Sequence, residues 1–132
     1  MNPSEYLSSY GVSRTAIREK LLSILSREDQ ALSSKEIEEK LGEDIDRVTL
    51  YRSIRLFEDK NIIHKIVIDD QTIKYKLINP KKGSTHPHFH CVECDKVLCL
   101  PETPLPQCNL PEGFSAKTQN TIVEGTCQKC NH

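Results

Sequence analysis

The chain has 132 residues, a formal net charge of −1 and six cysteines. This near-neutral balance gives no global basic field, so any contact with nucleic acid must come from a local basic face. No apolar run approaches the roughly 20 residues that a membrane helix needs, and the polar residues after Met1 do not form a signal peptide, so we expect a cytoplasmic protein without a membrane partner. In that compartment six cysteines indicate metal ligands rather than disulfides.

The first 78 residues predict helices followed by a β-hairpin. Apolar side chains recur at helical spacing in residues 13–27, and Ser33 with Glu36 offers a capping box for a second helix that ends at Gly42. A third amphipathic helix occupies residues 46–59 and makes a helix-turn-helix with the second. Two β-type runs joined by a short polar turn complete a winged helix. We also expect a short helix over residues 4–10, and strands over residues 62–69 and 72–78.

The remainder of the chain predicts a second, smaller domain. Residues 79–84 have the composition of a hinge, which divides the chain into domains 1–82 and 83–132. Four prolines in residues 101–113 predict an extended segment rather than a helix. We expect one strand that ends at Cys91, one over residues 96–100, and a final strand or hairpin over about 114–123.

Two Cys-x-x-Cys pairs, Cys91 with Cys94 and Cys127 with Cys130, form the strongest motif. Two-residue spacers let both thiolates of a pair reach one ion, so the pairs predict a tetrahedral structural Zn²⁺ site. Ordinary buried thiols and a redox pair are the alternatives. A thioredoxin-like pair would begin a helix within a βαβ unit, whereas the flanks here are strand-like, which favours zinc.

Three histidines alternate just before the first pair, at His86, His88 and His90. Alternate residues of a strand point to the same side, so these imidazoles are expected to share a face. They exceed what a structural zinc needs and suggest a second, regulatory metal site, to which Cys99 adds a thiol. The alternatives are incidental surface imidazoles and, for Cys99, a small apolar side chain.

The helix over residues 46–59 carries the candidate DNA-binding face. In a helix-turn-helix the second helix enters the major groove, where arginine pairs with guanine or holds a phosphate. A solvated charged face is the alternative, because Glu58 and Asp59 follow closely, but the hairpin wing favours DNA. The candidate contacts on this helix are Arg47, Thr49, Tyr51, Arg52 and Arg55.

Read together, six stretches resemble the ferric uptake regulator (Fur) family of bacterial metal-dependent repressors. They are TAIR at 15–18, SSKEI at 33–37, RVTLYR at 47–52, HPH at 86–88, CVECDKV at 91–97 and CQKC at 127–130. The resemblance implies an α+β fold, with an N-terminal winged helix-turn-helix domain followed by a small α/β dimerisation domain with a four-cysteine zinc site. It also implies a homodimer that binds an AT-rich, near-palindromic double-stranded DNA operator.

Several site residues follow from this resemblance. Tyr51 and Arg52 match the DNA-contacting pair of the family, and the four paired cysteines match its structural zinc ligands. Arg14 lies near the position whose basic side chain enters the minor groove. Arg18, in the first matching stretch, joins it as a candidate DNA contact.

The regulatory site is where the sequence departs from the family. The family usually takes one sensing ligand from a histidine before the second winged-domain helix and another from a carboxylate on the second wing strand. This chain has Ala31 and Lys76 there. His86 and His88 remain, and Cys99 replaces the last carboxylate. The ordinary clamp between the domains therefore cannot form, and the site either lies wholly in the C-terminal domain or uses another group.

The remaining ligands indicate the metal and the function. Two histidines with one cysteine, completed by His90 or Cys108, make a soft set that favours zinc over iron(II). We therefore expect a metal-responsive DNA-binding transcriptional regulator, a repressor and not an enzyme, with structural zinc and a zinc-sensing site. Two alternatives stay open: a Fur-like DNA-binding protein without metal sensing, and a zinc-ribbon and winged-helix adaptor that binds protein. A zinc hydrolase or deaminase is disfavoured, because two cysteine pairs fill the coordination sphere.

Overall fold

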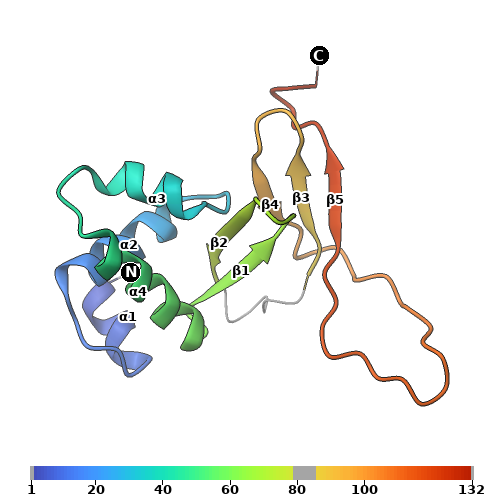
Figure 1. Ribbon diagram of the computed structural model, residues 1–132, viewed down its shortest axis with the longest axis horizontal. Helices are drawn as coiled ribbons and strands as arrows, with labels where there is room; N and C mark the ends of the chain where they lie inside the picture. The colour runs from blue at the N-terminus through green and yellow to red at the C-terminus, as the bar shows by residue number, and fades with distance from the viewer. Residues whose placement is uncertain (1, 79–85, 132) are drawn as a thin grey trace. The chain divides into compact units, whose positions relative to one another are not determined.

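The computed structural model describes residues 2–78 and 86–131, which form two compact units (Figure 1). The first unit ends at Ile78, so the predicted hinge and the predicted domain boundary after residue 82 lie outside the described residues. Within those two ranges no helix has the length and apolar character needed to cross a bilayer. Each unit is described by itself.

Local capping signals define the helices of the first unit. These helices are α1 (Pro3–Ser9), α2 (Ala16–Arg27), α3 (Ser34–Leu41) and α4 (Arg47–Asp59). The predicted capping box precedes α3: the Ser33 hydroxyl accepts from the Glu36 amide at 3.1 Å, and the Glu36 carboxylate accepts from the Ser33 amide at 2.9 Å. Gly42 ends α3 at a φ of 97°, which strains residues other than glycine. The Asp46 carboxylate then caps α4 by accepting from the Val48 amide at 3.1 Å.

A two-stranded wing completes the first unit. β1 (Ile63–Val67) and β2 (Ile73–Leu77) pair antiparallel, and the Asp69 carboxylate orders their turn by accepting from the amides of Gln71 and Thr72. The helices and the start of the wing share one apolar core, which gives the predicted winged helix with α1 added at its N-terminus. Its buried residues include Leu21, Leu22, Leu25, Ile37, Leu50, Ile54, Phe57, Ile62 and Ile63.

The second unit is built on a small sheet in the order β4-β3-β5 (Figure 1). Its strands are β3 (His88–Cys91), β4 (Val97–Cys99) and β5 (Ile122–Gly125). β3 is antiparallel to β4 and parallel to β5. Buried apolar side chains are few among its described residues, chiefly Cys91 and Val97. Such a thin core provides little hydrophobic stabilisation by itself.

The last predicted strand was misplaced. We expected a strand or hairpin over about 114–123, but β5 covers only Ile122–Gly125. Residues 101–121, all described, form neither helix nor strand, and they make the long loop between β4 and β5 in Figure 1. The physical reason is that residues 114–120 are all exposed, Phe114 to 68%, so this segment buries no apolar face against the sheet that would stabilise a strand there. As expected from its prolines, the segment 101–113 forms no helix.

Candidate metal centres and nucleic-acid interface

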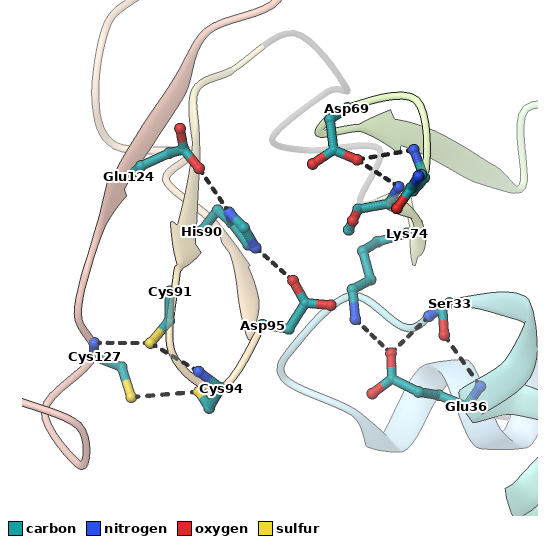
Figure 2. Close-up of polar contacts among 12 residues, drawn as sticks. Ser33, Glu36, Asp69, Lys74, His90, Cys91, Cys94, Asp95, Glu124 and Cys127 are labelled. Carbon is teal, nitrogen blue, oxygen red and sulfur yellow. Dashed lines mark hydrogen bonds and ion pairs between the residues drawn. The ribbon is translucent and has the colours of Figure 1, made fainter.

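The two cysteine pairs converge on one point at the ends of β3 and β5, where Figure 2 shows Cys91, Cys94 and Cys127. One sulfur from each of Cys91, Cys94, Cys127 and Cys130 lies within 4.8 Å of all the others. The Sγ atoms of Cys94 and Cys127 are 3.7 Å apart. Two sulfurs bound about 2.3 Å from a common tetrahedral zinc ion would lie about 3.8 Å apart, so the donor set fits such an ion.

Backbone amides stabilise negative charge on the Cys91 sulfur of this cluster. The Cys94 amide, at 3.5 Å, and the Cys127 amide, at 3.4 Å, both donate to the Cys91 sulfur. These hydrogen bonds, that from Cys94 first, lower the pKa of the Cys91 thiol to about 6. The thiol of Cys130, hydrogen-bonded to Cys127, instead has its pKa raised to about 12. Four thiolates at this point therefore require a cation between them, because without one the last thiol keeps its proton.

A second group of donors lies where β3 begins. His88 pairs with Cys99 across the antiparallel β3–β4 ladder, and His86 is two residues before His88. One donor atom from each of the three lies within 4.8 Å of the others. The imidazole rings are 4.7 Å apart and tilted by 53°, and His86 and His88 are 8% and 4% exposed. Burial lowers the pKa of His86 and so favours the neutral imidazole, which is the form that binds metal.

His90 does not belong to this second group. Its ring lies between two carboxylates, with Nε2 2.5 Å from Asp95 Oδ1 and Nδ1 3.0 Å from Glu124 Oε2 (Figure 2). Burial lowers the pKa of His90, but the hydrogen bonds to Asp95 and then Glu124 outweigh it, so the pKa is raised. Cys108 is exposed on the loop after β4 and belongs to neither donor cluster of the described residues. Sequence reasoning did not identify Asp95 and Glu124 as partners of His90.

The two positions where the family resemblance led us to expect further sensing ligands have structural surroundings in this chain. Ala31 is only 2% exposed, within the first unit. The Lys76 ammonium donates a hydrogen bond to the Glu28 carbonyl, just after α2. Lys74 lies on the same strand and is nearly buried. Its ammonium lies 2.6 Å from the Glu36 carboxylate at the start of α3 (Figure 2). Both wing lysines therefore attach β2 to the helices.

The predicted DNA-binding residues of α4 share an exposed surface. The five candidates are exposed, with Tyr51 47% accessible. Two of them contact α3: the Tyr51 hydroxyl donates to Glu38, and Arg47 Nε lies 3.7 Å from the other oxygen of the same carboxylate. The Thr49 hydroxyl donates to Asp46 at 2.8 Å and so takes part in capping the helix.

The two arginines near α2 are placed differently. Arg14 is exposed and lies 3.1 Å from the Glu19 carboxylate. Arg18 is half-buried, and its guanidinium donates to the Ser13 carbonyl at 2.8 Å and to the Ser13 hydroxyl at 2.7 Å. Arg14 is therefore the freer of the two to reach a phosphate or a groove.

A winged helix joined to a small sheet that carries two groups of soft metal donors defines a metal-responsive, DNA-binding transcriptional regulator. The model of the Ferric uptake regulator family matches residues 9–131. The chain belongs to this family.

Comparison with individual proteins agrees with this assignment. The chain is 28% identical over 129 residues to the ferric uptake regulation protein of Staphylococcus epidermidis, and the match covers 94% of this chain and 91% of that protein. Its fold is similar to that of the Vibrio cholerae ferric uptake regulator, with a TM-score of 0.68, 21% identity and coverage of 94% and 98%. A zinc uptake regulator complexed with zinc and DNA aligns with a TM-score of 0.65, 21% identity and coverage of 96% and 89%.

Proposed function

We propose that this protein is a zinc-responsive repressor that binds operator DNA in the cytoplasm as a homodimer. The observation that carries the proposal is the group of His86, His88 and Cys99, whose donor atoms lie within 4.8 Å of one another in the second unit. It is separate from the four-cysteine cluster, so one ion would serve stability and another would serve regulation. No catalytic step forms part of this function.

The chemistry of the donors supports zinc as the regulatory metal. Two imidazoles and a thiolate are borderline-soft ligands that suit Zn²⁺, whereas carboxylates and water suit harder cations such as Mn²⁺. His86 and His88 are almost fully buried, and the lowered pKa of His86 keeps its ring ready to bind a cation. Zinc would supply a positive charge that draws these three side chains together. The thiolate of Cys99 is the ligand that favours zinc over iron(II) at this site.

The four-cysteine cluster is the proposed structural site. Cys91, Cys94, Cys127 and Cys130 would hold Zn²⁺ permanently and join the two ends of a sheet that has little apolar core of its own. The amides that point at Cys91 favour its thiolate before any metal arrives. We therefore expect this zinc to bind first and to leave last.

The edge of the second unit supports the homodimer. β5 is at the end of the strand order, and none of the described strands pairs with its outer side. Val123, on this strand, is 47% exposed. An exposed strand edge with apolar side chains is a ready surface for a second copy, and a two-fold pair of copies matches a near-palindromic operator.

The exposed face of α4 is the proposed reader of an AT-rich operator. Tyr51 presents its ring for contact with thymine methyl groups, and Arg52 and Arg55 are placed to hold phosphates or guanine. Arg14 is a further candidate, for the minor groove, where arginine is attracted to narrow AT-rich DNA. Because the chain is near neutral, this local set must provide most of the attraction to DNA.

Zinc stoichiometry joined to DNA binding tests the proposal. Wild-type protein and the double variant His86→Ala, His88→Ala are purified anaerobically without added metal and then titrated with zinc. We expect two equivalents for the wild type and one for the variant, with zinc-dependent DNA binding only in the wild type. Cys99→Ser should also lose the second equivalent, and Cys108→Ser is its matched control, because the Cys108 thiol lies outside both clusters. Unchanged zinc uptake and unchanged DNA affinity in the double variant would refute zinc sensing.

A further inference from the structure

The ring of His90 links the two segments that carry the zinc ligands. One side of the ring contacts Asp95, which directly follows Cys94, and the other side contacts Glu124, three residues before Cys127 (Figure 2). The His90 side chain is only 9% exposed, while those of Asp95 and Glu124 are 56% and 57% exposed. We call this arrangement the His90 bridge.

The backbone on the Asp95 side is held in a special conformation. Asp95 has a φ of 67°, which few residues other than glycine adopt. Its amide donates to the Cys91 carbonyl at 2.9 Å, and the Cys91 amide donates to the Lys96 carbonyl at 2.9 Å. The contact between His90 Nε2 and Asp95 Oδ1, at 2.5 Å, stabilises this turn in a conformation that the backbone alone would not favour.

The Glu124 side is aligned by strand pairing. His90 and Glu124 are register partners in the parallel β3–β5 ladder, and the Val92 amide donates to the Gly125 carbonyl at 2.9 Å. The contact between His90 and Glu124 therefore adds a side-chain hydrogen bond to the backbone pairing, at the end of β5 that leads to Cys127. Since the Cys127 amide itself donates to the Cys91 sulfur, a small shift of β5 would change the cluster directly.

We propose that His90 is a positioning residue for the structural zinc: by holding Asp95 and Glu124 on its two sides, it keeps the turns that carry Cys94 and Cys127 at the separation that closes around one ion, and so slows the loss of that ion. This role rests on the proposed structural zinc. Burial of a polar ring in so small a sheet is costly unless both nitrogens are satisfied, and here both are. Groups that orient metal ligands typically change metal affinity by about 10- to 100-fold when removed.

The rate of zinc release tests this role in the full-length chain. Zinc-loaded protein is mixed with excess EDTA, and retained zinc is measured over time for the wild type, His90→Leu and Phe89→Leu. Leucine fills much of the imidazole volume without contacting either carboxylate, and we expect His90→Leu to lose zinc about tenfold or more faster. Phe89, also on β3, packs near Gly125 and makes no part of the bridge, so Phe89→Leu controls for general weakening of the sheet.

Two further measurements separate positioning from a purely structural effect. Glu124→Ala and Asp95→Gly remove exposed carboxylates, and glycine also suits the positive φ at position 95, so these variants decide the question even if His90→Leu does not fold. Each should accelerate zinc release, and combining Glu124→Ala with His90→Leu should add little, because both break the same bridge. The absorption spectrum of the Co²⁺-substituted protein should also change in His90→Leu and stay wild-type in Phe89→Leu, since it reports the geometry of the four thiolates.

The outcomes are distinct. Faster release in His90→Leu and Glu124→Ala but not in Phe89→Leu would support the bridge. Equal rates in wild type and His90→Leu, or equal acceleration in Phe89→Leu, would overturn it while leaving the structural zinc in place. A wild-type protein that retains no zinc after purification would overturn the structural zinc itself, and the role of His90 with it.

Discussion

Glu38 on α3 is expected to weaken DNA binding, because its carboxylate contacts two of the side chains that would bind DNA. Its carboxylate accepts the Tyr51 hydroxyl and lies 3.7 Å from Arg47 Nε. DNA must compete for Arg47 and must also approach a carboxylate whose side chain is 20% exposed. We predict that Glu38→Gln binds DNA more tightly than the wild type.

The magnitude follows from two terms. The Arg47 side chain is 77% exposed, and ion pairs at such sites contribute about 0.2 to 1 kcal/mol. Repulsion between a carboxylate and a phosphate about 10 Å away in water adds about 0.4 kcal/mol before screening. Together they amount to about 1 kcal/mol per protomer, which corresponds to roughly fivefold in affinity.

Fluorescence anisotropy with a labelled AT-rich duplex, selected by the zinc-loaded wild-type protein, measures this effect. The gain should shrink as salt rises, because screening removes both terms. Glu39→Gln is the matched control: it removes the same charge from the next position of α3, where the side chain is exposed. Weaker DNA binding by Glu38→Gln, or an equal gain in Glu39→Gln, would refute the reasoning.

Three further predictions concern stability. Ser33→Ala breaks the capping box of α3 and should lower the free energy of unfolding of the first unit by about 1 kcal/mol in urea titrations, whereas Ser26→Ala, an exposed position within α2, should change it little. Burial raises the pKa of Glu36, but the hydrogen bonds from Lys74 and from the Ser33 amide, with the charge of Lys74, together outweigh it, and the pKa lies below its ordinary value of 4.5. The stabilisation from this pair is therefore complete above about pH 4.5 and is lost as the pH falls through the lower folded-state pKa; thermal unfolding of Glu36→Gln should show a flatter acid dependence. Removal of zinc with a chelator should unfold the second unit, seen as loss of dispersed amide signals from β3 to β5 in NMR spectra, while the first unit persists; a second unit that stays folded would contradict a structural role for the metal.

The winged helix could be predicted because its signals are local. Ser33, Gly42 and Asp46 each act within one turn of the helix end that they define, and the apolar spacing of α4 identifies its buried side. The four-cysteine metal site could also be predicted, since a two-residue spacer is a local signal that both thiols of a pair bind one metal ion.

The His90 bridge could not be predicted in the same way. His90 alternates with His88, so the sequence suggested one shared metal site, but its partner Glu124 is 34 residues away and becomes a neighbour only through the parallel pairing of β3 with β5. Parallel pairing depends on a long crossover whose path is not encoded in any short motif. The hydrogen bond between Tyr51 and Glu38 also depends on tertiary contacts, so it could not be predicted either. The same is true of the start of β5, which lies later in the chain than expected.

The attachment of Lys76 to the Glu28 carbonyl restricts how this protein can evolve. The ligand set that the family resemblance leads us to expect needs a carboxylate at position 76 and a histidine at position 31. The first change alone would place an anion against a carbonyl oxygen that now accepts a hydrogen bond. The second alone would force an imidazole into the space of a nearly buried alanine, where overpacking typically costs about 1 to 3 kcal/mol. Each single step lowers stability before both ligands are in place, so selection would act against the intermediates and tend to preserve Ala31 and Lys76.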